Sequence, residues 1–101
     1  MDYVGSKLHN TLGEEIGTVT DVIYRPTDLE PEWITVKKGL LGHEHLLPVS
    51  ALTERVGMLM TTVNPDLIKH SPVVNEHITP TKDEAHEVLA ALGLAADDRP
   101  E

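Results

Sequence analysis

The chain has 101 residues, with eight lysines and arginines against seventeen aspartates and glutamates, so its formal net charge is −9. This length is that of one domain. The negative charge argues against binding to nucleic acid or anionic lipid, which require clustered basic side chains. Cysteine is absent, which excludes disulfides and thiolate metal sites. The sequence has no secretory signal pattern and no apolar run of the ~20 residues that a membrane span needs. We therefore expect a cytoplasmic protein without membrane insertion.

The first half of the chain predicts short β-strands separated by glycine and proline. Five strands are expected, over residues 4–9, 17–24, 33–38, 45–49 and 56–63. The apolar–polar alternation of the second strand slips at residues 21–23, which indicates a bulge or a strand contacted on both faces. In the third strand, Ile34 and Val36 share one face and Thr35 the other. Pro48 places its strand at an edge, an end or a bulge, because proline cannot donate to the ladder.

The second half predicts two helices with well-marked ends. Asn64 and Pro65 are typical of the N-cap and the first helical position, and this helix should stop near His70, because Pro72 disfavours a helical conformation in the residue before it. A second helix is expected over about residues 81–93. Thr81 and Glu84 have the spacing of a capping box, and Gly93 supplies the C-terminal stop.

The run Gly13–Ile23 resembles the opening signature of the PRC-barrel family, a glycine, two variable residues, Ile-Gly, and then a valine and an aspartate at alternate positions. The apolar third strand and the Leu47-Pro48-Val49 segment match the series that follows, and the likeness covers roughly residues 2–95. One departure is the loop of residues 25–32, where a tight glycine turn is common in the family. Better-known relatives are the cytoplasmic domain of the photosynthetic reaction-centre H subunit and the C-terminal domain of a ribosome-maturation factor.

The resemblance implies a mainly β fold, a small antiparallel PRC-type β-barrel with one short helix and a C-terminal amphipathic helix. Residues 1–95 would form this single domain, and residues 96–101 an acidic, disordered tail. The resemblance also implies an adaptor that serves as a docking surface, without a shared set of catalytic residues and without a cofactor.

His43 and His45 are the candidate metal ligands. If they lie on one strand they point to the same face, and two imidazoles in that relation can share a Zn²⁺, Ni²⁺ or Cu²⁺ ion. The spacing brings no third ligand to them, and a metal site needs three or four. An exposed polar face beside a turn is therefore the favoured interpretation, with a metal- or small-ligand-binding protein as the alternative function.

Candidate catalytic groups lack the arrangement that catalysis requires. Asp21 could nominally pair with Glu14 or Glu15, but a carboxylate beside a turn more often caps backbone donors. The serines carry no nucleophile elbow. Gly13 and Gly17 lack the pattern of a phosphate-binding loop and are interpreted as turn glycines. The sequence therefore predicts no enzyme.

An interaction surface is the remaining hypothesis. Its candidate residues are two leucines between glycines and two apolar residues of the second helix, namely Leu40, Leu41, Val88 and Leu92. The leucine pair could dock a partner or cap the end of the barrel, and the helix stripe must pack on the barrel or on another chain. A homodimer would cover exposed strand edges. The negative charge either aids solubility or steers the protein to a basic partner.

Overall fold

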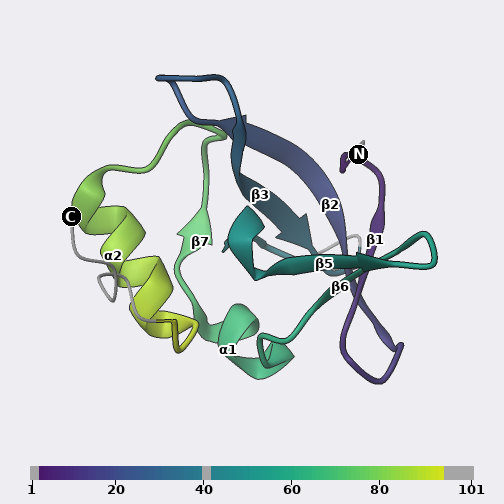
Figure 1. Ribbon diagram of the computed structural model, residues 1–101. Helices are drawn as coiled ribbons and strands as arrows, with labels where there is room; N and C mark the ends of the chain where they lie inside the picture. The colour runs from purple at the N-terminus through teal and green to yellow at the C-terminus, as the bar shows by residue number, and fades with distance from the viewer. Residues whose placement is uncertain (1–2, 40–41, 95–101) are drawn as a thin grey trace.

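The computed structural model describes residues 3–39 and 42–94, and these form a seven-stranded sheet with two α-helices (Figure 1). The strands are β1 (Lys7–His9), β2 (Glu15–Tyr24), β3 (Pro31–Lys37), β4 (Glu44–Pro48), β5 (Leu52–Arg55), β6 (Met58–Thr61) and β7 (Val73–Val74). A single 3₁₀ turn (Val49–Ala51) joins β4 to β5, and the helices are α1 (Pro65–His70) and α2 (Lys82–Ala91). The mainly β prediction is therefore confirmed.

The sheet is mixed, whereas an antiparallel one was expected, and its strand pairing does not confirm a barrel. Its order is β5-β6-β1-β2-β3-β4-β7, and β1 pairs with β6 in parallel while the other pairs are antiparallel. Within the described chain, β5 and β7 pair on one side only, so the sheet is not closed. The parallel pair joins strands that are distant in sequence, and strand alternation does not reveal which strands become neighbours.

The core consists of aliphatic side chains from the central strands and from both helices. The buried apolar residues are Leu8, Val19, Ile23, Trp33, Ile34, Val36, Leu46, Leu47, Leu59, Val63, Ile68, Val88 and Leu92. β3 is buried on both faces. Thr35 points to the face opposite Ile34 and Val36, and it too has no exposed surface. The outer face of β3 is thus covered as well as the inner one.

The predicted ends of both helices are confirmed. The Asn64 side chain accepts a hydrogen bond from the Asp66 amide at 2.9 Å, and Ser71 is extended just before Pro72. At the start of α2, Thr81 Oγ1 accepts from the Glu84 amide at 3.1 Å and Glu84 Oε1 accepts from the Thr81 amide at 2.7 Å. These caps satisfy backbone donors that the first helical turn leaves without partners.

The predicted strand over residues 56–63 is present only as β6, because Val56 and Gly57 form the two-residue turn of a hairpin whose first strand, β5, was not expected. Both residues have positive φ, 52° for Val56 and 75° for Gly57, as a type I′ turn requires. A β-branched residue is strained in this conformation. Val56 is also fully exposed, with a relative accessibility of 105%.

We expect Val56→Asn to raise the free energy of unfolding by about 1 kcal/mol, because asparagine adopts positive φ more readily than valine. Urea unfolding followed by circular dichroism measures this gain. Val56→Ile is the matched control, since isoleucine keeps the branched side chain and should give no gain. Equal stability of the asparagine and isoleucine variants would contradict the assignment of strain.

Candidate functional site

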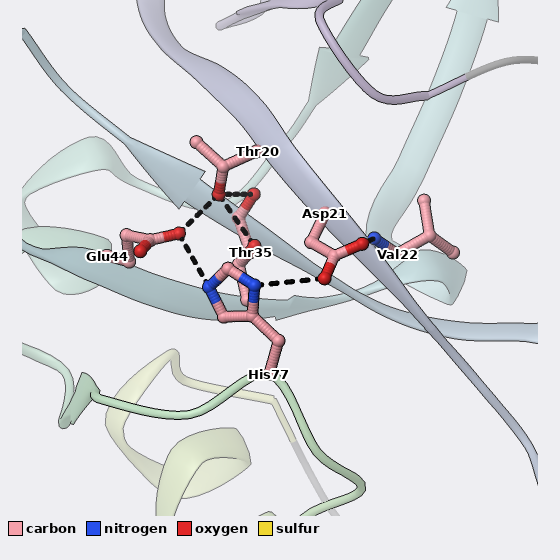
Figure 2. Close-up of polar contacts among 6 residues, drawn as sticks. All are labelled: Thr20, Asp21, Val22, Thr35, Glu44 and His77. Carbon is pink, nitrogen blue, oxygen red and sulfur yellow. Dashed lines mark hydrogen bonds and ion pairs between the residues drawn. The ribbon is translucent and has the colours of Figure 1, made fainter.

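A polar bridge joins the loop between β7 and α2 to two strands of the sheet (Figure 2). His77, in that loop, places Nδ1 2.9 Å from Asp21 Oδ2 on β2 and Nε2 2.9 Å from Glu44 Oε1 on β4. The Asp21–His77 and Glu44–His77 pairs are 56 and 33 residues apart in sequence. One imidazole therefore ties together three segments that are distant along the chain.

Both ring nitrogens of His77 face carboxylate oxygens. An ionised carboxylate only accepts hydrogen bonds, and a neutral imidazole can donate from one nitrogen only. With carboxylate oxygens at both nitrogens, only the imidazolium donates to both, and each contact is then also an ion pair. The ring thus acts as a cross-link between β2 and β4.

Glu44 receives a second donor from the neighbouring strand. The hydroxyl of Thr20 donates to Glu44 Oε1, and it also lies 2.7 Å from the hydroxyl of the buried Thr35. The Thr20 hydrogen bond, followed by the charge and hydrogen bond of His77 and the charge of Lys37, holds the pKa of Glu44 below its ordinary value against the opposing effect of burial. Glu44 is thus held in its ionised form.

A bulge in β2 places Thr20 and Asp21 together at this site. Val19 pairs with Val36 and Asp21 with Thr35, so Thr20 is the additional residue in the ladder. Successive residues of a regular strand point to opposite faces, and a bulge re-aims a side chain. The sequence predicted this bulge from the break in apolar–polar alternation at residues 21–23, one residue after its actual position at Thr20. It did not point to Glu44 or His77, whose contribution depends on tertiary contacts.

A groove of about 360 Å³ lies beside the bridge, between β7 and α2. Its apolar lining includes Leu46, Val74, Ile78 and Val88, and its acidic lining consists of Glu76, Glu84 and Glu87. Figure 1 shows β7 at the end of the sheet next to α2. The loop that carries His77 supplies one wall of the groove, and the bridge links that loop to β2 and β4.

His43 and His45 both line a second cavity, of about 720 Å³, but do not form a metal centre with a third ligand. His45 Nδ1 lies 3.2 Å from Ser71 Oγ and 3.3 Å from the Pro72 carbonyl oxygen. Across residues 3–39 and 42–94, no three histidine or acidic side chains are grouped so that they could hold a metal ion. His43 precedes β4, so the two histidines do not share a strand.

The other candidate catalytic residues have structural contacts. Asp21 Oδ1 accepts from the Val22 amide at 2.8 Å, the backbone capping that the sequence favoured. Its acidic partner across the bridge is Glu44, whereas Glu14 accepts from Asn10 and Glu15 lies 3.6 Å from Lys7. The buried Ser71 hydroxyl donates to the Ile68 carbonyl at 2.6 Å, so its proton is engaged at the end of α1.

The predicted interaction surface is corrected in its helical part. Val88 and Leu92 are 3% and 2% exposed, because α2 packs its apolar stripe on the sheet and on α1 of its own chain. They are therefore not available to a partner. Leu40 and Leu41 lie outside the described residues, as do residues 96–101 of the predicted tail. Val73 and Ile78, which line the groove beside α2, are instead exposed.

None of the helices described is both long enough and apolar enough to cross a lipid bilayer. The sequence matches no protein-family model and no curated protein.

Proposed function

We propose that this chain is a non-catalytic protein-interaction module of the PRC-barrel type that binds a partner protein and pairs with a second copy of itself. The observation that carries the proposal is the open sheet, in which β5 and β7 each pair on one side only within the described chain. An unpaired strand edge is a template for pairing with another chain. The residues that resemble the PRC-barrel signature form the β1–β2 turn and β2, which supports the family assignment.

The non-catalytic part of the proposal is supported by the polar bridge. Both nitrogens of His77 face carboxylates, and Glu44 is held by two donors. A general base needs a lone pair directed at its substrate, which this arrangement does not offer. The absence of cysteine supports a cytoplasmic setting for the module.

Self-association is assigned to the β5 edge, which has no partner strand on one side within the described chain. When two copies of β5 pair antiparallel about a twofold axis, the backbone donors and acceptors of each edge meet those of the other. Glu54 pairs with Leu59 between two hydrogen-bonded pairs of the β5–β6 hairpin, so its amide points away from β6 and towards the free edge.

A proline substitution tests this assignment. We expect sedimentation velocity to show a dimer whose dissociation constant rises about tenfold in Glu54→Pro, because proline removes the outward-facing amide. Glu54→Ala removes the same side chain but keeps the amide, so it should leave the dimer intact and serves as the control. A wild-type chain that stays monomeric at high concentration would contradict self-association.

A further inference from the structure

We infer that the groove between β7 and α2 binds an extended partner segment in which lysine or arginine alternates with aliphatic residues. This inference rests on the proposed interaction function and names the chemistry of its partner. The groove is formed by described residues and is distinct from the β5 edge assigned to self-association.

The apolar side chains of the groove provide contacts for aliphatic residues. Leu46 and Val88 are buried within it, and Ile78 stands at its rim with 64% of its surface exposed. Val73, which also lines the groove, is 45% exposed. A concave site with exposed aliphatic walls gains stability when an apolar side chain displaces water from it.

The charges of the groove select a basic partner. Three glutamates line it, and none of the described lining residues is a lysine or arginine. Glu84 already caps α2, whereas neither Glu76 nor Glu87 forms a hydrogen bond or ion pair within the described chain. These two carboxylates, in a chain of net charge −9, complement basic side chains and repel acidic ones.

The free edge of β7 selects an extended conformation. β7 pairs with β4 through Val74 and Val73 on one side, and it is the last strand of the described sheet on the other. An added strand forms backbone hydrogen bonds to such an edge and directs alternate side chains to opposite faces. Aliphatic residues on the face turned to the groove then meet its apolar walls, and the long lysine side chains between them can reach the exposed glutamates Glu76 and Glu87.

The His77 bridge prepares the groove for binding. Asn75, Glu76, Ile78 and Pro80 line the groove on either side of His77 in sequence. Because His77 is held by Asp21 and Glu44, this wall need not be ordered when the partner arrives, which lowers the entropic cost of association.

Fluorescence anisotropy with labelled peptides tests the inference. The probe is an acetylated hexapeptide of alternating lysine and valine. A lysine–serine peptide keeps the charge without the aliphatic side chains, and a glutamate–valine peptide reverses the charge. We expect the lysine–valine peptide to bind about tenfold more tightly than the lysine–serine peptide, and the glutamate–valine peptide to show no binding. Equal affinity for the two basic peptides would overturn the proposal, because binding would then reflect net charge alone.

Substitutions in the groove locate the binding site. Ile78→Ser and Glu87→Lys should each weaken binding of the lysine–valine peptide by at least about fivefold. Leu29→Ser and Glu30→Lys make matched changes at exposed positions of the loop between β2 and β3, and should leave the affinity within about twofold. Both groove variants alter exposed side chains, so they should fold normally, which circular dichroism verifies. Loss of binding in the loop variants, or unchanged binding in the groove variants, would overturn the proposal.

Sedimentation velocity on the same variants separates this inference from the proposed function. If Ile78→Ser dissociates the dimer, the groove is occupied by a second copy and the inference is wrong. If the dimer is intact and sensitive to Glu54→Pro, but the peptide binds no better than its controls, the interaction function stands and the groove assignment fails. Peptide binding that Ile78→Ser abolishes, with the dimer unchanged, supports both.

Discussion

Replacing Gly17 with alanine is expected to lower the free energy of unfolding by about 2 kcal/mol, the range typical of overpacked cores. Gly17 lies inside β2, opposite Leu8 of β1, and not in a turn as its sequence context indicated. A Cβ atom at this position would approach Val36 Cγ1 to 2.7 Å and the Lys37 carbonyl oxygen to 3.3 Å. Val36 is 4% exposed, and its branched side chain has little freedom to move aside.

A double-mutant cycle with Val36→Ala shows whether this contact is the cause. Val36→Ala alone creates a cavity and destabilises the fold, but in the Gly17→Ala background it removes the clashing methyl group. The double variant should therefore be more stable than the sum of the two single effects predicts, by about 1 kcal/mol. Urea unfolding of the four proteins gives the coupling energy. Strict additivity would mean that Gly17 is required for another reason.

Breaking the polar bridge at Glu44 is expected to change how stability depends on pH. The pKa of Glu44 is lowered in the folded chain, chiefly by the Thr20 hydrogen bond and then by His77. A lowered folded pKa means that the ionised Glu44 carboxylate contributes stability above the unfolded pKa, about 4.3 for glutamate. That contribution is lost as pH falls through the folded pKa. Glu44→Gln should therefore lose about 1 kcal/mol at pH 7 and less in acid.

Urea unfolding at several pH values between 7 and 3 measures this effect, and the wild-type and Glu44→Gln curves should converge at the acid end. Thr20→Val removes the hydroxyl that donates to Glu44, so this variant should also be less stable than wild type at pH 7 and approach it in acid. A residual acid dependence is expected in Glu44→Gln, because Arg25 lowers the pKa of Asp28 by a hydrogen bond and by its charge. Glu30→Gln is the control at a loop carboxylate. A constant difference between wild type and Glu44→Gln across the range would contradict a lowered pKa.

The same substitution reports on the loop that forms the groove wall. Removing the Glu44 charge leaves His77 with one ionised partner, Asp21. Amide hydrogen exchange in residues 75–80 should then become faster relative to β3, because local opening of the loop breaks fewer contacts. Unchanged exchange in the loop would show that its position is held by the surrounding packing and not by the bridge.

The sequence by itself determined the features that depend on neighbouring residues. Asn64, Thr81 and Glu84 cap helices because their side chains reach amides two or three residues away, and proline restricts the backbone directly before it. These interactions are complete within one turn, so spacing alone predicts them. Period-two alternation likewise predicted that Ile34 and Val36 are buried.

Only the tertiary structure decided which segments meet. His77 lies in an unremarkable loop by sequence, and it becomes a cross-link because strand order brings β2 and β4 within reach of its ring. The apolar stripe of α2 could have faced another chain, but Val88 and Leu92 pack on their own sheet, which leaves Ile78 and the edge of β7 exposed. The periodicity of apolar residues and their helix or strand propensity determine which face of an element is apolar. What covers that face depends on contacts between residues far apart in the chain, which the local pattern does not encode.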